Sequence, residues 1–437
     1  MHAQHLTRPV PEDNSKDDKT KKGWDARKYW RIRPPGALVS KQHILPVPYL
    51  SCINTIAAKI AEIFIKNFPS RPAIYFSPGR INLIGEHVDY NDGFVMPAAI
   101  DKGIYFAIAE NGKDVAHFYS LDFDEQFSAN INDIKRNDGW KNYVLGVINE
   151  FLLLKKNIKG FDCVFAGDIP VGAGLSSSAA VEGGLAFALN EIFDCGLSRV
   201  ELAQLCQRAE HDFPGVQCGI MDQFANMMGK QGEVILLDCR NLSYQYFLLT
   251  LEGYKIVLLN SMVHHTLASG EYNVRRKQCE EGLMLMGADS PVRSFRDIRK
   301  WENLLAYEAV MGKEVFMRCM YVVQEIERTK KAAALLQQNN LIEFGKLMYA
   351  THQGLSKLYA VSCAELDLLV ELAEQNPTVI GARMMGGGFG GCTINIVKEE
   401  SVNDFIEQAS IAYEEKFEIL PAAYVVETSD GVKQYKK

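Results

Sequence analysis

One segment limits the possible folds more than any other: residues 161–193 join an apolar strand to a helix through a loop of glycines and serines. The run "FDCVFAG" predicts a buried strand, and "SAAVEGGLAFALNEIF" predicts a helix. Between them stands "GAGLSSSAA" at 172–180. At such a junction backbone N–H groups and the positive helix end point toward one place, where an anion can bind. This stretch alone fits a phosphate-binding loop and an ordinary Gly-Ser helix cap about equally well.

The residue types in the loop suit phosphate chemistry. Glycines let the backbone approach phosphate oxygens closely, and serine hydroxyls add donors and a hard oxygen ligand for magnesium. Several other motifs are missing from the chain: there is no GxxxxGK[ST], no GxSxG, no SxxK, and no HRD or DFG. The chain therefore lacks the motifs expected of a P-loop protein, a serine hydrolase or a protein kinase.

Length and charge narrow the class of protein further. With 437 residues the chain exceeds a usual single domain, so two domains are expected. A net charge of −7 argues against a nucleic-acid partner and favours a small substrate. The sequence shows no membrane span and no apolar signal segment, which predicts a cytoplasmic protein. Ten cysteines without a CxxC pair suit reduced thiols.

The first 45 residues differ from the rest of the chain. They mix charges of both signs with prolines and few aliphatic residues, so we expect residues 1–45 to be a disordered extension. The folded part is predicted to begin with a helix near "INTIAAKIAEIFIKNF", whose apolar residues recur at helical spacing. The stretch "AIYFSPGRINLIGEH" at 73–87 then predicts a strand broken by a Pro-Gly turn.

A further helix is predicted over residues 196–213 by its start signal. Ser198 followed by Glu201 matches a capping box, and an apolar stripe follows at helical spacing. Glu210 lies near the end of this helix. Beyond residue 236, "YKIVLLNS" and "GCTINIV" predict strands, with long helices between them and a glycine-rich turn, "GGGFGG".

Two more stretches concentrate groups suited to catalysis. "PGRINLIGEHVDYNDGFVMP" at 78–97 gathers Arg80, two carboxylates and an imidazole, and "CGIMDQFAN" at 218–226 places Asp222 in an apolar setting. Together with the serine run and "GGGFGG", these stretches closely resemble the galactokinase branch of the GHMP small-molecule kinases. The resemblance covers roughly residues 50–437, and its motif GRxNLIGEHxDYN is specific.

The resemblance implies an α+β fold with two domains and the site between them. Residues 46–235 would form a domain like the second domain of ribosomal protein S5, and residues 236–437 a ferredoxin-like domain. The family's first domain contains a left-handed βαβ crossover, which general handedness rules do not predict. The family pattern does not cover residues 1–45.

The resemblance also assigns sugar contacts. In the family, the Glu, His and Asp of the first motif, the Gly of GIMDQ and the Tyr of SxEY contact the sugar. The matching residues are Glu86, His87, Asp89, Gly219 and Tyr272. Carboxylates make charge-assisted hydrogen bonds to hydroxyls, which supports the assignment. His87 alone would more often be a structural histidine, but beside two carboxylates the sugar contact is favoured.

For catalysis, the resemblance makes Asp222 the candidate base for a sugar hydroxyl. Arg80 matches the cation that stabilises the alkoxide and the charge of the transferring phosphoryl group. A buried structural ion pair between the two residues is the alternative, and both descriptions can hold at once. The reaction implied is transfer of the γ-phosphoryl of ATP to the anomeric hydroxyl of galactose, which gives α-galactose 1-phosphate.

The nucleotide site follows from the same resemblance. The loop residues expected at ATP are Gly172, Gly174, Ser176, Ser177 and Ser178. Magnesium is held in the family by a loop serine and a glutamate, which match Ser178, with Ser177 as the alternative, and Glu210. Trp140 matches a tryptophan near the adenine, although an ordinary core tryptophan explains it equally well. The turn "GGGFGG" resembles the third motif of the superfamily, a tight turn that brings the backbone near the active centre, and a plain hairpin with glycines at positive φ is the alternative.

The identity of the sugar stays open in the sequence. Val88 stands where many galactokinases carry Thr, so a related kinase of N-acetylgalactosamine or arabinose is the nearest alternative. A non-catalytic galactose sensor is a further alternative, but the serine motif is intact and Arg80 and Asp222 are both present. The expected partners are galactose and ATP, and the expected assembly is a monomer or weak homo-oligomer.

Overall fold

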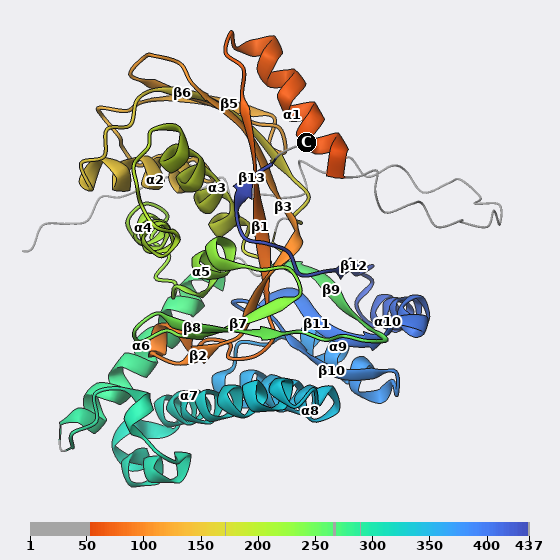
Figure 1. The fold of residues 1–437 in the computed structure, drawn as a ribbon. Coiled ribbons are helices and arrows are strands. Elements are labelled where there is room, and N and C mark those ends of the chain that lie inside the picture. Colours follow the sequence, from red (N-terminus) through yellow and green to blue (C-terminus); the bar gives the residue numbers. More distant parts are fainter. Residues whose placement is uncertain (1–52, 171, 265–267, 289, 436–437) are drawn as a thin grey trace, which may run out of the picture. The chain divides into compact units, whose positions relative to one another are not determined.

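The first sheet has six strands and takes residues from both ends of the described chain (Figure 1). This computed structural model describes residues 53–435 except 171, 265–267 and 289, so the extension expected at 1–45 lies outside the described residues. The strand order is β13-β1-β3-β6-β4-β5, and β4 pairs with β6 in parallel. The strands are β1 (Ala73–Asn82), β3 (Pro97–Glu110), β4 (Val115–Ser120), β5 (Glu125–Asn130), β6 (Phe161–Gly167) and β13 (Lys433–Gln434).

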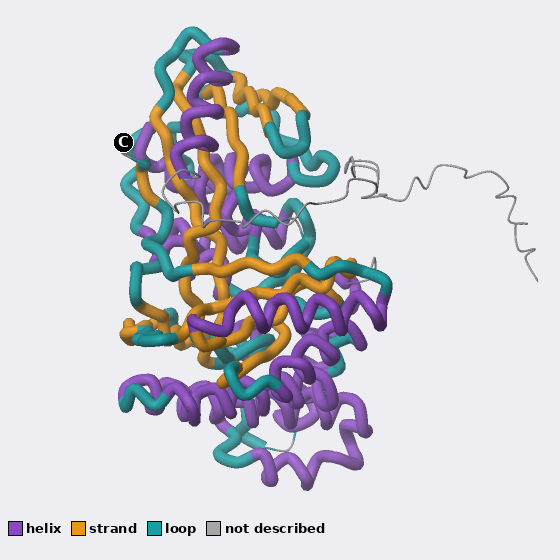
Figure 2. The backbone as a smooth tube through the Cα atoms, turned by 90° about the vertical axis from the view of Figure 1, so that its right-hand side faces the viewer, coloured by secondary structure: helices purple, strands orange, loops and turns teal. Residues whose placement is uncertain are grey.

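Helices cover both faces of this sheet because neighbouring side chains on a strand point to opposite sides. Phe76 packs in the core beneath α1 (Ile53–Asn67). Its neighbour Tyr75 packs on the opposite face, where its ring lies 6.1 Å from that of Phe187. Figure 2 shows α1 apart from the other helices of this region. Those helices are α2 (Lys141–Leu153), α3 (Ser177–Ile192), α4 (Arg199–Asp212) and α5 (Met221–Met228).

A second, antiparallel sheet has four strands in the order β10-β11-β9-β12. Its strands are β9 (Tyr254–His264), β10 (Val379–Met384), β11 (Gly390–Lys398) and β12 (Ala422–Val426). Helices α9 (Ala364–Gln375) and α10 (Val402–Phe417) bury Leu369 and Phe405 against Val257 and Leu259 of β9. This core is separate from the large core of the first sheet.

The remaining elements connect these two regions. A three-stranded sheet consists of β2 (Phe94–Val95), β7 (Glu233–Asp238) and β8 (Ser243–Leu248). Helices α6 (Ala268–Gly287), α7 (Glu308–Gln337) and α8 (Leu341–Gln353) follow β9 in the chain. Helix α8 approaches β10 closely at Gly345, where a Cβ would lie 1.9 Å from the carbonyl oxygen of Ile380. Only glycine allows this close approach.

The local predictions can be compared with these elements. The strand, loop and helix expected over residues 161–193 are present as β6 and α3, and Ser198 and Glu201 form the predicted capping box at α4. The Pro-Gly turn expected within 73–87 is wrong. Strand β1 continues through it with a bulge between Pro78 and Arg80, because pairing with β3 resumes on both sides.

The α+β class is confirmed, whereas the boundary between residues 235 and 236 stays a prediction. Strand β13, near the C-terminal end, pairs with β1 of the first sheet, so the last described residues return to the region where the chain starts. Across the described ranges, no helix has both the length and the apolar character needed to cross a bilayer.

Candidate active site

Most of the residues selected from the sequence line one cavity of about 250 Å³. Its walls come from β1 and the segment after it, the end of α4, the start of α5, α6 and the glycine-rich turn before β11. The predicted residues in its lining are Arg80, Glu86, His87, Asp89, Glu210, Gly219, Asp222 and Tyr272. Val88 is fully buried and does not belong to the lining, so its side chain does not touch the cavity.

Arg80 and Asp222 form a bidentate ion pair in the cavity wall. The Arg80 Nε donates to Asp222 Oδ1 at 2.7 Å, and Nη2 donates to Oδ2 at 2.9 Å. Ser176 Oγ also donates to Oδ2, at 2.5 Å, so the carboxylate joins the cation to the serine run. The Asp222 side chain is 27% exposed and that of Arg80 is 5% exposed. A ligand can therefore reach the carboxylate, while the guanidinium fixes its orientation.

Asp89 lies under the backbone of Gly219. A Cβ at position 219 would lie 2.0 Å from Asp89 Oδ2, which explains why this position requires glycine. Burial raises the pKa of Asp89 to about 7, and the nearby carboxylates of Asp222 and Glu86 add to this effect. Asp89 therefore changes its charge near neutral pH.

His87 points its ring at the cavity from a left-handed backbone conformation, with φ at 59°. Its ring centroid lies 5.4 Å from that of Tyr272, which comes from α6. Burial lowers the pKa of His87 to about 4, so the imidazole is neutral at pH 7. Its Nε2 is buried and makes no hydrogen bond of ordinary geometry among the described residues, although the Gly387 backbone lies close enough to oppose the lowering of the pKa.

Glu86 is held by an arginine that the sequence reasoning did not select. Arg383 of β10 is fully buried and its Nη1 donates to Glu86 Oε2 at 2.8 Å. Its Nε donates to the carbonyl oxygen of Leu83 at 2.9 Å, and the Gly386 N–H donates to Glu86 Oε2 at 3.1 Å. Burial raises the pKa of Glu86, but Arg383 and Arg80 outweigh it and hold the pKa below its ordinary value. Glu86 therefore remains ionised.

Glu210 and Ser178 meet beside the ion pair. Burial and the Asp222 charge raise the pKa of Glu210 to about 7, although hydrogen bonds from Cys218, Ser178 and Gln223 oppose the shift. Gln223 Nε2 donates to Glu210 Oε2 at 2.7 Å. Because little positive charge surrounds this buried carboxylate, a bound cation would stabilise its ionised form. Its oxygen and the Ser178 hydroxyl are hard donors, which suit magnesium.

The described residues contain no group of three or more His, Cys, Asp or Glu side chains arranged to hold a metal ion. Magnesium bound to phosphate takes few ligands from the protein and keeps several waters. The donor set formed by Glu210 and Ser178 is of that kind.

The serine run and the glycine-rich turn lie against each other. Ser176 precedes α3 in a left-handed conformation with φ at 58°, and its side chain does not cap the helix, because it bonds to Asp222 instead. A Cβ at Gly386 would lie 3.2 Å from the carbonyl oxygen of Gly174. Arg80 Nη1 donates to that same oxygen at 2.5 Å. The two glycine-rich motifs and the ion pair thus form one structure.

The other residues predicted to bind ATP do not line the cavity. Ser177 and Gly172 belong to the serine run itself, whereas Trp140 lies elsewhere in the fold. Ser177 opens α3, and the Gly172 carbonyl oxygen would lie 3.4 Å from a Cβ at Gly391. Trp140 does not line the cavity. Its Nε1 donates to Glu125 at 2.7 Å, and its ring is parallel to that of Phe123 with centroids 6.1 Å apart. The rings of Phe127 and Phe165 also pack on Trp140 edge to face, with centroids 5.2 and 5.3 Å away, so the indole is partly buried.

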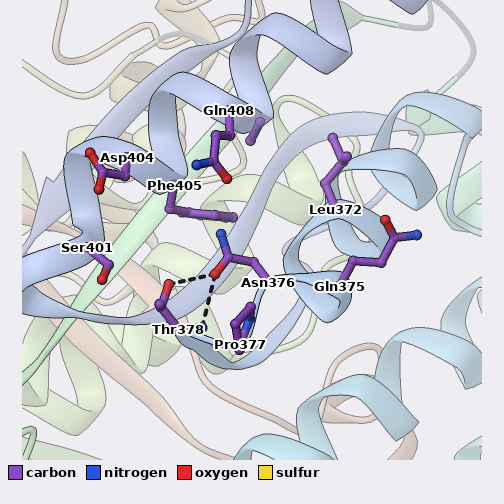
Figure 3. Close-up of a pocket in the computed structure, with 10 residues that line it drawn as sticks. Leu372, Gln375, Asn376, Pro377, Thr378, Ser401, Asp404, Phe405 and Gln408 are labelled. Carbon is purple, nitrogen blue, oxygen red and sulfur yellow. Dashed lines mark hydrogen bonds between the residues drawn. The ribbon is translucent and has the colours of Figure 1, made fainter.

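A larger cavity of about 400 Å³ lies between α10 and the C-terminal end of α9, which leads into β10 (Figure 3). Amide and hydroxyl side chains line it together with Leu372, Pro377, Phe405 and Ala409, and Asp404 is its one carboxylate. Asn376 Oδ1 accepts hydrogen bonds from the backbone and the hydroxyl of Thr378. This cavity has neither a pair of acid and base groups nor a cation, and it contains none of the residues selected from the sequence. The smaller cavity is therefore the candidate active site.

The stretch 78–97, here called the sugar motif, is held in place by residues from the second half of the chain, and sequence reasoning missed those residues. Arg383 had a recognisable signal, because a charge in the apolar run "VIGARMM" is unusual unless it is paired. Glu325 of α7 is fully buried and accepts the Gly85 N–H at 2.9 Å, and Tyr321 donates to the Glu86 carbonyl oxygen at 2.9 Å. These two have no local signal, since their partners lie more than two hundred residues away.

Comparison with protein families gives three matches along the chain. Residues 62–110 match the galactokinase galactose-binding signature. Residues 142–230 match the GHMP kinases N-terminal domain, and residues 332–415 match the GHMP kinases C-terminal model. The galactose-binding signature includes Arg80 and the segment with Glu86, and the N-terminal model includes the serine run and Asp222.

Curated relatives and a solved structure agree with these matches. A galactokinase of Clostridium acetobutylicum is 42% identical over 392 residues, which are 88% of this chain and 100% of the relative. A galactokinase of Bacillus subtilis is 40% identical over 86% of this chain and 99% of the relative. The crystal structure of Lactococcus lactis galactokinase complexed with galactose superposes with a TM-score of 0.84 at 35% identity, and covers 86% of this chain and 99% of that one.

Proposed function

The chain belongs to the galactokinases of the GHMP kinase superfamily, and we propose that its cavity transfers the γ-phosphoryl group of ATP to the C1 hydroxyl of galactose. The observation that carries the mechanism is the bidentate pair of Arg80 and Asp222, which joins the sugar motif to the serine run through Ser176. One side of this pair faces sugar-binding side chains, and the other side faces the start of α3.

Galactose binds among the polar groups of the lining. Glu86, which stays ionised, accepts hydrogen bonds from sugar hydroxyls, and Asp89 does the same when it is ionised. The Gly219 backbone and the Tyr272 side chain complete the wall around the sugar. A carboxylate that accepts two hydroxyls in a fixed geometry distinguishes epimers, because the wrong epimer leaves a buried acceptor without a partner.

ATP binds with its phosphates at the start of α3. The backbone of residues 172–178 and the hydroxyls of Ser177 and Ser178 offer donors where the helix end is positive. Trp140 is the residue that we assign to the adenine. Ser178 and Glu210 would hold a magnesium ion, which when bound neutralises charge on the phosphates.

Asp222 accepts the proton of the C1 hydroxyl as that oxygen attacks the γ-phosphorus of ATP. The new C1–O–P bond forms while the bond from phosphorus to the β,γ-bridging oxygen breaks, and ADP leaves with that oxygen. Arg80 is placed to stabilise the developing negative charge, because it is always protonated and is held next to the base. The products are α-galactose 1-phosphate and ADP, and the proton on Asp222 is later lost to solvent.

We place the enzyme in the cytoplasm as a monomer or weak homo-oligomer. The cysteines of the described chain are all free, which fits a reducing compartment.

The experiment that tests this proposal is a phosphorylation assay with ATP and free sugars: galactose, N-acetylgalactosamine, arabinose and glucose. We expect the highest kcat/KM with galactose and turnover of about 1 to 100 per second. Preference for N-acetylgalactosamine would replace the galactose assignment. Binding of galactose and ATP without turnover would instead indicate a sensor.

A further inference from the structure

Behind His87 lies a chain of hydrogen-bonding side chains that the catalytic mechanism does not use. His87 Nδ1 is 2.8 Å from the hydroxyl of Tyr90, which is 2.9 Å from the hydroxyl of Tyr359. The Tyr359 hydroxyl is in turn 3.3 Å from the Sγ of Cys279. The four residues come from the sugar motif, the π-helical turn after α8, and α6. We call this set the His87 relay.

Most of the His87 relay is buried. Tyr359 and Cys279 are fully buried, His87 is 3% exposed, and Tyr90 is partly buried. Burial raises the pKa of Cys279 to about 12, and it raises those of Tyr90 and Tyr359 well above their ordinary values. All three groups therefore keep their protons at neutral pH, and each proton needs an acceptor inside the relay.

The protons can run along the relay in two directions. If His87 Nδ1–H donates to Tyr90, then Tyr90 donates to Tyr359, and Tyr359 donates to the sulfur of Cys279. That order ends on a weak acceptor and leaves the buried Cys279 S–H to find another one. Asn91, whose amide hydrogen bonds to the Cys279 thiol, is a donor on that side of the sulfur and cannot take a proton through its nitrogen.

The opposite direction satisfies every group. Cys279 S–H donates to Tyr359, Tyr359 donates to Tyr90, and Tyr90 O–H donates to His87 Nδ1, a strong acceptor in neutral imidazole. The Cys279 sulfur remains free to accept from Asn91. In this order the protons of Cys279, Tyr359 and Tyr90 each have a partner at the distances given above.

We propose that the His87 relay fixes His87 in the tautomer with its proton on Nε2, so that His87 donates a hydrogen bond to a hydroxyl oxygen of the sugar. The proposal rests on the proposed function for the identity of the ligand, whereas the tautomer rests on the relay alone. His87 lines the cavity, and its Nε2 is buried without a hydrogen bond of ordinary geometry, although the Gly387 backbone lies near the ring. A hydroxyl oxygen of the sugar can therefore supply the acceptor for the Nε2 proton.

With this tautomer, the site offers the sugar both hydrogen-bond acceptors and a hydrogen-bond donor. Glu86 and ionised Asp89 can only accept hydrogen bonds, whereas His87 supplies a neutral donor. A sugar must then present an oxygen lone pair to His87 and hydroxyl protons to the two carboxylates. Tyr90 and Tyr359 act on the sugar through His87, so they are positioning residues.

Nitrogen-15 NMR of the free enzyme, with labelled histidine, reads the tautomer directly. The ring signals of His87 are assigned by comparison with His87→Gln. We expect the protonated-nitrogen signal at Nε2 and the unprotonated-nitrogen signal at Nδ1. A proton on Nδ1 would overturn the proposal. Because this measurement contains no sugar, it stands even if galactose proves not to be the substrate.

Kinetics of Tyr90→Phe and Tyr359→Phe test the consequence for the sugar. Tyr90→Phe removes the donor to Nδ1, so we expect the two tautomers to mix and the KM for galactose to rise roughly fivefold, with kcat and the KM for ATP within about twofold of wild type. Tyr359→Phe leaves Tyr90 in place and should have a smaller effect. The matched control is Tyr413→Phe, which removes a buried hydroxyl that donates to the Ser261 carbonyl oxygen at 2.8 Å.

The control separates a positioning effect from a loss of stability. Tyr413→Phe should lower Tm about as much as Tyr90→Phe and leave the KM for galactose unchanged. If Tyr90→Phe changes only Tm, with the His87 signals and the galactose KM as in wild type, the relay is structural and the proposal is wrong.

Discussion

Asp222 is the residue on which the proposed chemistry depends most directly. Asp222→Asn keeps the size of the side chain but removes its basic charge. We expect kcat to fall roughly a hundredfold to ten-thousandfold, the usual contribution of a general base. Galactose and MgATP should still bind in calorimetric titrations, because the contacts assigned to them come from other residues. Arg80→Met should also act mainly on kcat, since the cation counts more in the transition state.

The double variant tests whether the pair acts as a unit. Its loss should be smaller than the product of the two single losses, because each residue needs the other to be oriented. Asp162→Asn is the control: Asp162 is also buried, and it accepts from Asn111 at 2.9 Å away from the cavity. A folded Asp222→Asn enzyme with most of its kcat would leave Asp222 only a structural role.

Glu210 makes the stability of the enzyme depend on pH. Its pKa in the folded protein is about 7, above the ordinary 4.5, because it is buried near Asp222. The folded protein therefore favours the protonated form. Its contribution to stability is complete below about 4.5 and is lost as the pH rises through about 7. Glu210→Gln removes this loss, so in magnesium-free buffer we expect a higher Tm than wild type at pH 8 and little difference at pH 4.5.

Thermal denaturation at both pH values checks this, with titration of MgATP alongside. The variant should bind MgATP more weakly, because it lacks one ligand. Glu201→Gln on the same helix should instead lower Tm at pH 8. Hydrogen bonds from Ser198 lower the pKa of Glu201 in the helix cap, so its ionised form stabilises the fold. An equal change in Tm at both pH values would show that Glu210 is not titrating in this range.

Among the elements, β10 supports the sugar motif through Arg383, which pairs with Glu86. Arg383→Met would leave Glu86 charged and buried without its cation, which costs about 3–5 kcal/mol in similar cases. We expect this loss in urea denaturation, together with a higher KM for galactose. Lys346→Met, which breaks an exposed pair with Glu343, should cost at most about 1 kcal/mol. Similar losses for the two variants would contradict the assignment of Arg383.

The elements also show what a single sequence can predict. The capping box at Ser198 and the serine run before α3 have short-range signals, and both were predicted correctly. The Pro-Gly step in β1 was misjudged because its outcome depends on pairing with β3, which lies elsewhere in the chain. The bond from Ser176 to Asp222, the pair of Arg383 with Glu86, and the His87 relay all join distant segments. Only the folded chain brings such groups together.

At the scale of the whole molecule, the two ends of the chain should behave differently. The relatives match 86–88% of this chain over almost their entire length, so part of this chain has no counterpart in them. Residues 1–45 have too few apolar side chains to bury much surface. We expect deletion of residues 1–45 to leave kcat, both KM values and Tm nearly unchanged. A loss of several degrees in Tm would show that this segment packs on the fold.

Deletion of residues 428–437 should have the opposite result, because the C-terminal end supports α5. The Val432 N–H donates to the Asn226 carbonyl oxygen at 2.8 Å, and Val432 is fully buried. Asn226 lies one turn after Asp222 on α5, and its side chain donates to the Pro78 carbonyl oxygen at 2.7 Å. The deletion thus removes strand β13 from β1 and loosens the helix that holds the base.

We therefore expect the C-terminal deletion to lower both Tm and kcat. A variant that keeps the chain but replaces Val432 with Ala should show a smaller loss of Tm, since it retains the backbone pairing with β1 and Asn226. Thermal denaturation and steady-state kinetics of the three variants, measured side by side, give the comparison. If neither deletion changes Tm or kcat, the return of the chain to the first sheet has no effect on catalysis. Asp222 would then be positioned by Arg80 and Ser176 alone.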